Sequence, residues 1–128
     1  MKHTLGFDFP NLPYLIDENE KGETVRLTES HAIYRYICGK YNPELLGKTL
    51  EDRGKVDMFL GFAQDMRTAS YQHIYETGDK EAVKKIGFER MEPISRFLGD
   101  KQFIVGDYVT YPDFLLYEWI EMYDYICD

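Results

Sequence analysis

The sequence predicts a mostly helical α+β protein in which a short β-hairpin near the N-terminus is followed by several long helices. A chain of 128 residues that is 44% hydrophobic and 16% aromatic can bury one modest core. Before residue 30, short apolar runs are bounded by proline and glycine, as is typical of strands. From residue 30 onward, apolar residues recur every three or four positions, which is the period of an amphipathic helix.

The first element expected is a hairpin with strands at residues 12–17 and 23–28, joined by a polar turn. Pro10 and Pro13 exclude a helix here, because proline lacks the N–H group of a helical hydrogen bond. Pro13 opens the first strand after a constrained loop, so the Leu12–Pro13 bond is the best candidate for a cis peptide. A cis bond would turn the backbone amide and carbonyl of Leu12 outward, towards a ligand.

A helix is expected next, over residues 30–40, with its end at Gly39. Thr28, Glu29 and Ser30 lie at its start, where free backbone N–H groups favour an anion. Taken singly, a serine at a helix start is more often a simple cap than a ligand-binding residue.

The chain is expected to form two domains, residues 1–41 and 42–128. Between them, Pro43 and Gly47 interrupt the helical pattern and mark a linker.

Three helices are expected in the second domain, at residues 49–76, 79–98 and 110–127. Pro93 should bend the second helix or break it in two. The third begins with a capping-box pattern and carries large apolar side chains around most of its circumference. We therefore expect this third helix to be buried on nearly all sides.

The charge and the cysteines narrow the class of protein. A formal net charge of −8 and a pI near 4.9 disfavour nucleic acid and anionic membranes as partners, because no basic stripe is present. Cys38 and Cys127 lack the spacing of a metal site or a redox pair, so we expect reduced thiols and no bound metal. No signal peptide or membrane-length apolar run is apparent. Location in the cytoplasm or an organelle matrix is expected.

Two segments carry a resemblance to a known family. Residues 8–17 read DFPNLPYLID, and residues 30–33 read SHAI. Together they resemble the glutathione-binding region of mu-class glutathione S-transferases, and the resemblance extends more weakly over most of the chain. It implies a partial glutathione transferase fold: the β-β-α end of a thioredoxin-like domain, followed by part of the all-α C-terminal domain.

The resemblance also implies a glutathione site. The backbone of Leu12, before Pro13, would pair with the cysteinyl part of glutathione, and Asn11 would assist. Glu29 and Ser30 would hold the γ-glutamyl end, where the mu class usually has Gln at the position of Glu29.

Three further roles follow from alignment with the mu class. Asp65 would reach across a dimer to the amine of glutathione, and Tyr75 would face the electrophile pocket. Lys2 would lie near the glycine carboxylate. Each of these residues also has a simpler interpretation. Asp65 would be a solvated acid on a helix, Tyr75 a core aromatic residue and Lys2 a solvated lysine near the terminus.

The resemblance places the catalytic tyrosine, which stabilises the thiolate, in a segment expected before Met1. We therefore expect no catalytic residue in this chain, and two hypotheses remain. The favoured one is a non-catalytic, glutathione transferase-like subunit of a larger assembly. The alternative is a fragment of an active transferase that conjugates glutathione to electrophiles.

Apolar surface that the chain is expected to leave exposed predicts a protein partner. The hairpin at residues 12–28 has an open edge, and the helix at 110–127 exposes large side chains. Another chain is expected to cover both, with Trp119 in the interface. A homodimer is one form that this pairing could take.

Overall fold

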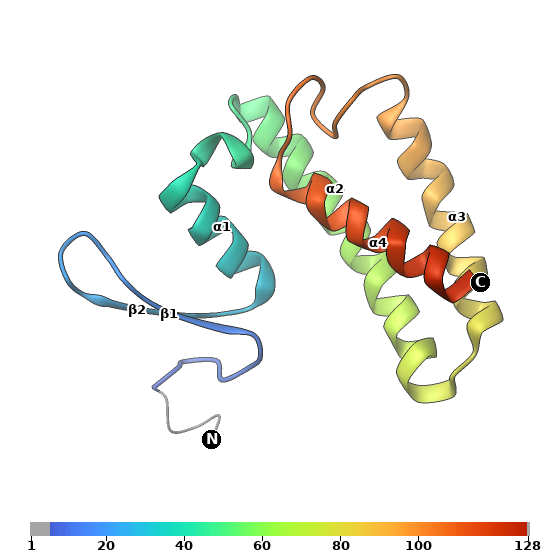
Figure 1. Ribbon diagram of the computed structural model, residues 1–128, viewed down its shortest axis with the longest axis horizontal. Coiled ribbons are helices and arrows are strands. Elements are labelled where there is room, and N and C mark those ends of the chain that lie inside the picture. Colours follow the sequence, from blue (N-terminus) through green and yellow to red (C-terminus); the bar gives the residue numbers. More distant parts are fainter. Residues whose placement is uncertain (1–5, 128) are drawn as a thin grey trace. The chain divides into compact units, whose positions relative to one another are not determined.

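The computed structural model describes residues 6–127 and divides the chain into two compact units, with the division after residue 43 (Figure 1). The first unit contains strands β1 (Tyr14–Glu18) and β2 (Thr24–Thr28) and helix α1 (Ser30–Tyr41). The second contains helices α2 (Leu50–Gln72), α3 (Lys80–Leu98) and α4 (Tyr111–Cys127). The predicted class, a hairpin followed by helices, is confirmed.

Strands β1 and β2 form an antiparallel hairpin in which Tyr14 lies opposite Thr28. The turn is organised by Asn19, whose side-chain oxygen accepts hydrogen bonds of 2.9 Å from the backbone amides of Lys21 and Glu23. An asparagine that bonds to the backbone in this way stabilises the turn without requiring a partner from another element.

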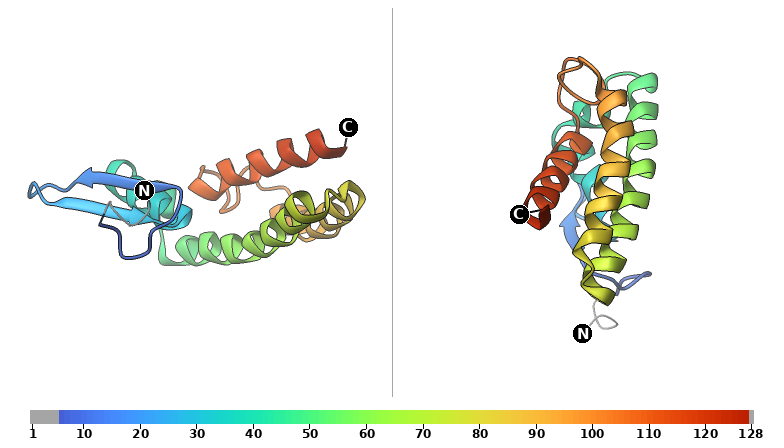
Figure 2. Two further views of the ribbon diagram at one scale, coloured as in Figure 1. Left: turned by 90° about the horizontal axis from the view of Figure 1, so that it is seen from below. Right: turned by 90° about the vertical axis from the view of Figure 1, so that its right-hand side faces the viewer.

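Helix α1 contacts both strands (Figure 2, left). Leu15, Val25 and Leu27 are partly buried in the alternating pattern of a strand with one covered side. The other face of the hairpin is open, with Tyr14 and Ile16 exposed to 46% and 48%.

Helix α1 runs through Gly39 and ends at Tyr41, so the expected end at Gly39 is wrong. The helix stops because Pro43 disfavours a helical backbone at the residue before it. The N–H group of Asn42 still caps the helix by donating to the carbonyl of Cys38, at 2.8 Å.

Lys40 joins the last turn of α1 to the end of β1. Its ammonium group pairs with the carboxylate of Asp17 and donates a hydrogen bond of 2.9 Å to the carbonyl of Glu18. The hydrogen bond from Lys40 lowers the pKa of Asp17, and the carboxylate raises the pKa of Lys40 in return.

In the second unit, α2, α3 and α4 pack against one another (Figure 2, right). Thr49 caps α2 by accepting a hydrogen bond from the amide of Asp52 at 3.1 Å. Asp79 caps α3 in the same way, through the amide of Ala82 at 3.0 Å. Pro93 lies inside α3, which continues past it as one helix, so the expected break does not occur.

A π-helical turn, His73–Thr77, extends α2, and the sequence did not predict it. Gly78 ends the turn with a left-handed backbone, at φ 66°.

Within the described residues, helix α4 is buried on one side only, and burial of its remaining sides stays a prediction. Trp119 is only 8% exposed and stacks on Phe59 of α2 with ring centroids 6.4 Å apart. Trp119 is therefore part of the unit's own core, and the expectation that it lies in a partner interface is wrong. The opposite side is open, with Phe114, Tyr117 and Tyr125 exposed to 57%, 64% and 83%.

One polar contact is buried where the three helices meet. The Ser70 hydroxyl donates to the carbonyl of Met66 at 2.9 Å and shares a second hydrogen bond with the Tyr123 hydroxyl. The ring of Tyr123 lies directly over Gly87 of α3, where an added Cβ atom would be 2.6 Å from the ring carbon Cδ1. Only glycine leaves room for this ring.

Gly87→Ala should therefore destabilise the protein, although alanine normally favours a helix. The clash with Tyr123 should lower the free energy of unfolding by about 1–3 kcal/mol. Gly61→Ala in α2 is the matched control, because an added Cβ there meets nothing within 4 Å. This control should raise stability by up to about 1 kcal/mol. Urea denaturation followed by Trp119 fluorescence measures both, and equal effects of the two variants would contradict the packing described.

The segment between α3 and α4 is fixed to the start of α2 by Tyr108. Its hydroxyl donates to the carboxylate of Asp52 at 2.7 Å and accepts from the amide of Lys48 at 2.8 Å. The hydrogen bond from Tyr108 lowers the pKa of Asp52. Burial, followed by the nearby carboxylate, raises the pKa of Tyr108.

Asp113 fixes the other end of this segment. Its carboxylate accepts hydrogen bonds of 2.7 Å from the amide and from the hydroxyl of Thr110. It also accepts one of 2.8 Å from the amide of Ile104. The hydrogen bond from the Thr110 amide to the Asp113 carboxylate is one half of the expected capping box, and it is confirmed. The other half would have the Thr110 hydroxyl accept from a backbone amide of the helix, but this hydroxyl donates to the Asp113 carboxylate instead.

The contact between Tyr108 and Asp52 predicts loss of stability at both ends of the pH range. Because the pKa of folded Asp52 is lowered, its contribution is present above its unfolded value and is lost as the pH falls below about 4. Because the pKa of folded Tyr108 is raised, its contribution is present below about 10 and is lost as the pH rises further. Urea titrations at a series of pH values give the free energy of unfolding, and in Tyr108→Phe this energy should fall less steeply at both low and high pH than in the parent. If it falls as steeply as in the parent, other groups cause the pH dependence.

Candidate functional site

The loop before β1 presents its backbone at the open end of the hairpin. The Leu12–Pro13 peptide is cis, as predicted, and Leu12 is 64% exposed. The hydroxyl of Thr28 donates a 2.7 Å hydrogen bond to the carbonyl of Phe9, which holds the loop against the end of β2. The backbone of Leu12 is thereby displayed beside the start of α1.

Glu29 adopts an uncommon backbone conformation between β2 and α1. Its φ of 69° is the one positive value recorded for a residue other than glycine within residues 6–127. Positive φ is unfavourable for a glutamate and is concentrated at functional sites. The Glu29 carboxylate accepts a hydrogen bond of 3.3 Å from the side-chain amide of Asn11. This contact joins the two segments that the sequence predicted to bind glutathione.

The first backbone N–H groups of α1 begin at Ser30, and no side chain caps them at Glu29. The start of a helix carries partial positive charge, which favours a carboxylate ligand. The hairpin end therefore brings together five predicted residues that offer an amide, a carboxylate, a hydroxyl and exposed backbone: Asn11, Leu12, Pro13, Glu29 and Ser30.

Asp65 and Tyr75 belong to the second unit, and their roles stay predictions. Asp65 is exposed on α2. Tyr75 lies in the π-helical turn, is 78% exposed and stacks on Tyr71 with ring centroids 5.4 Å apart. The guanidinium of Arg67 lies 4.8 Å from the centre of the Tyr71 ring.

The sequence analysis singled out Tyr75 and missed Tyr71 and Arg67. Their spacing of four residues along a helix is the signal that could have found them, because such residues share one face. π-helical turns often occur at functional sites, which makes this stack a candidate surface for an aromatic ligand.

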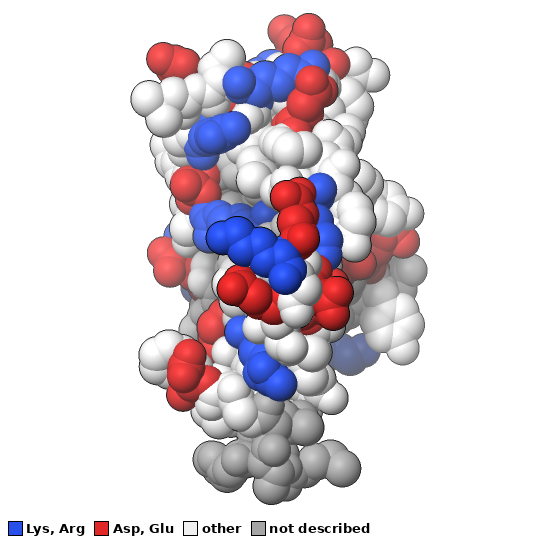
Figure 3. Space-filling model, turned by 90° about the vertical axis from the view of Figure 1, so that its left-hand side faces the viewer, with Lys and Arg blue, Asp and Glu red and all other residues white. Residues whose placement is uncertain are grey.

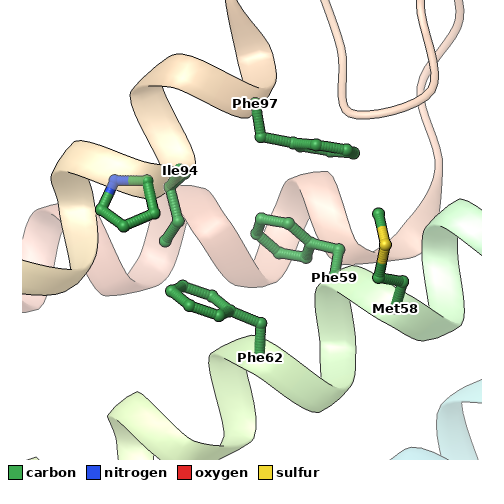
Figure 4. Close-up of a pocket in the computed structure, with 6 residues that line it drawn as sticks. Met58, Phe59, Phe62, Ile94 and Phe97 are labelled. Carbon is green, nitrogen blue, oxygen red and sulfur yellow. The ribbon is translucent and has the colours of Figure 1, made fainter.

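The second unit also has an apolar groove of about 170 Å³ between α2 and α3. Figure 4 shows side chains of both helices directed into it. The groove is lined by Met58, Phe59, Phe62, Pro93, Ile94 and Phe97. The cations of Arg90 and Lys101 lie over the rings of Phe62 and Phe97, at 5.3 and 4.0 Å. The groove therefore suits an apolar side chain that has acidic neighbours.

Other kinds of site find little support. Within residues 6–127 no three His, Cys, Asp or Glu side chains are grouped so that they could hold a metal ion. No helix in that range has the length and apolarity needed to span a membrane. On the face drawn in Figure 3, Lys and Arg side chains lie among Asp and Glu. Cys38 is a free, buried cysteine, whereas Lys2 and the side chain of Cys127 lie outside the described residues.

Comparison with known proteins identifies the family. Residues 64–128 match the model of the glutathione S-transferase C-terminal domain. The chain is 42% identical to glutathione S-transferase Mu 1 of Bos taurus over 127 residues, which is 95% of this chain and 54% of that protein. It is 40% identical to glutathione S-transferase 2 of Gallus gallus over 124 residues, covering 94% and 53% of the two chains.

The chain belongs to the glutathione S-transferase family, and it is similar to the mu class. It spans about half the length of the curated relatives that it matches.

The backbone of Glu29 yields a test of the strain at the site. Glu29→Gly and Glu29→Ala remove the same carboxylate, but only glycine adopts φ 69° without steric conflict. We expect the glycine variant to be more stable than the alanine variant by about 1 kcal/mol. Urea titration followed by the NMR signals of α1 amides measures the difference. An alanine variant at least as stable as the glycine variant would show that the backbone there is unstrained.

Proposed function

We propose that this chain is a glutathione-binding, non-catalytic subunit of a larger protein assembly. The observation that carries the proposal is the hydrogen bond between Asn11 and Glu29, because it holds together the two segments that the mu-class resemblance assigns to glutathione. The N-terminal end of α1 supports it, because a helix start carries partial positive charge and glutathione carries two carboxylates.

In this proposal, glutathione lies along the open end of the hairpin. The exposed backbone of Leu12 pairs with the cysteinyl part, as another strand would pair with a free edge. Ser30 and the start of α1 bind the γ-glutamyl carboxylate, while the Glu29 carboxylate faces the ammonium group. Asp65 of a second copy reaches the same amine, and Tyr75 faces the electrophile pocket.

The chain by itself is proposed to bind without catalysing conjugation. The resemblance assigns thiolate stabilisation to a tyrosine on a strand that these 128 residues do not include. Without that donor, the glutathione thiol keeps a pKa of about 8.5, as for an ordinary cysteine. The electrostatic contribution that dominates this kind of catalysis is then missing.

Another chain is proposed to cover the open face of the hairpin and the exposed side of α4. A second copy is one such partner, with the groove between α2 and α3 as a further contact. Phe9 is 77% exposed and follows Asp8, so it offers an apolar ring with an acidic neighbour. The groove offers the complement, an apolar lining flanked by Arg90 and Lys101.

A second candidate function is that of a fragment of an active transferase that conjugates glutathione to electrophiles. The similarity to a protein named glutathione S-transferase Mu 1 favours it, because that similarity covers 95% of this chain. In either case the buried, free Cys38 supports a reducing compartment such as the cytoplasm or an organelle matrix.

Glutathione titration and an activity assay test these proposals together. Millimolar glutathione should shift the amide NMR signals of Leu12 and Ser30, and Glu29→Ala should reduce the shifts. Glu20→Ala, in the turn at the far end of the hairpin, is the matched control and should leave them unchanged. Conjugation of glutathione to an aryl halide should stay at the background rate.

The outcomes separate the two candidates. A rate that rises with protein concentration and is lost in Ser30→Ala would establish the second candidate in place of the first. Signals of Leu12 and Ser30 that stay unmoved would remove glutathione from the function of this chain.

A further inference from the structure

Thr28 lies where the loop formed by residues 9–13 meets the start of α1. It is the last residue of β2 and is followed directly by Glu29. Because side chains alternate along a strand, Thr28 shares one face of β2 with Thr24 and Arg26. Those two residues are exposed, whereas Thr28 is only 9% exposed. The Thr28 side chain is therefore enclosed at the end of the hairpin that carries the candidate site.

Both ends of the loop are attached to this one residue. At the beginning of the loop, the hydroxyl of Thr28 donates a hydrogen bond of 2.7 Å to the carbonyl of Phe9. At the end of the loop, Tyr14 lies opposite Thr28 in the pairing of β1 with β2. Residues 9–13 therefore form a short loop that is closed on Thr28, and the exposed residue Leu12 lies within it.

Side-chain hydrogen bonds attach the loop to the end of β2 and to the residue after it. Within the described residues, two such bonds join residues 9–13 to other elements. One is the partly buried bond from Thr28 to Phe9, and the other is the bond of 3.3 Å from Asn11 to Glu29, whose side chains are exposed. A hydrogen bond that is shielded from water is electrostatically stronger than one that water surrounds. The Thr28 hydroxyl is therefore the main polar attachment of the loop besides strand pairing.

Thr28 also borders the unfavourable backbone of Glu29. Glu29 has a φ of 69°, and its carbonyl accepts a hydrogen bond of 3.0 Å from the amide of Ile33 in α1. Such a conformation persists only where the surrounding structure fixes it. The first turn of α1 fixes Glu29 on one side and Thr28, held in β2, fixes it on the other. One residue thus holds both the loop and the backbone to which the loop is joined.

We infer that Thr28 is the positioning residue of the glutathione site. The inference rests on the proposed function, since it concerns how the site is prepared for that ligand. The hydroxyl holds the loop so that Asn11 and Leu12 already lie beside Glu29 in the free protein. A loop that is ordered in advance loses less conformational entropy on binding, so the affinity is higher. Thr28 acts through the loop and not by contact with the ligand.

Four variants of the full chain separate the hydroxyl from the other properties of Thr28. Thr28→Val removes the hydroxyl and keeps the β-branched shape of the side chain. Thr28→Ala removes the hydroxyl without adding a methyl group, and it takes the place of the valine variant if that variant does not fold. Thr28→Ser keeps a hydroxyl and should restore the behaviour of the parent. Thr24→Val is the matched control, because Thr24 lies in the same strand at the far end of the hairpin, opposite Glu18.

The order of the loop is measured without any ligand. In Thr28→Val, the heteronuclear NOE of the Asn11 and Leu12 amides should fall, because NMR relaxation reports motion on the ps–ns timescale. The amide signal of Val25 should keep its position, which verifies that the strands stay paired. Thr28→Ser and Thr24→Val should both resemble the parent.

The affinity for glutathione is then measured from the shift of the Ser30 amide signal. Thr28→Val should weaken binding by about three- to tenfold, the range that corresponds to the loss of one hydrogen bond. Thr28→Ser and Thr24→Val should retain the affinity of the parent. A threonine with a purely structural role would lower the free energy of unfolding when replaced, but it would leave the affinity of the folded chain unchanged.

Four results would overturn the inference. They are a loop as ordered in Thr28→Val as in the parent, parental affinity in Thr28→Val, equal losses in Thr28→Val and Thr24→Val, and equal losses in Thr28→Val and Thr28→Ser. Absence of glutathione binding by the parent chain would instead contradict the proposed function. Because the order of the loop is measured without ligand, it decides in that case too whether Thr28 positions the loop.

Discussion

The fit of Tyr123 over Gly87 determines how the helical unit is assembled. The ring fills the space that the missing side chain leaves, and its hydroxyl reaches Ser70 on the remaining helix. This contact fixes the rotation of α4 about its own axis. With that rotation fixed, Trp119 must lie in the core and the side of α4 that carries Glu121 must face outward. The internal packing and the external surface of α4 thus have one cause.

Local signals in the sequence were sufficient for most of the fold. Thr49 and Asp79 begin helices because their side chains accept the amide hydrogen bonds that a helix start leaves open. The cis peptide before Pro13 followed from the loop that precedes it. The predicted end of α1 at Gly39 was wrong, because a glycine permits a helix to stop but does not force it to, whereas Pro43 prevents the helix from continuing.

Features that depend on tertiary contacts were not predictable. The side of α4 that becomes buried depends on where α2 and α3 lie, and the apolar pattern of α4 covers too much of its circumference to decide this. The positive φ of Glu29 breaks a local preference, as residues at functional sites often do. The hydrogen bond from Asn11 to Glu29 joins residues from two segments, so only the fold brings it about.

The turn held by Asn19 and the cluster around Asn11 and Glu29 lie at opposite ends of the same two strands. Pairing between the strands fixes the cluster whatever the length of the turn. The side-chain oxygen of Asn19 closes the turn locally. The hairpin thus separates the residues that close its turn from the residues of the candidate site, so a change in the length of the turn would leave the pairing that holds Asn11 beside Glu29 intact.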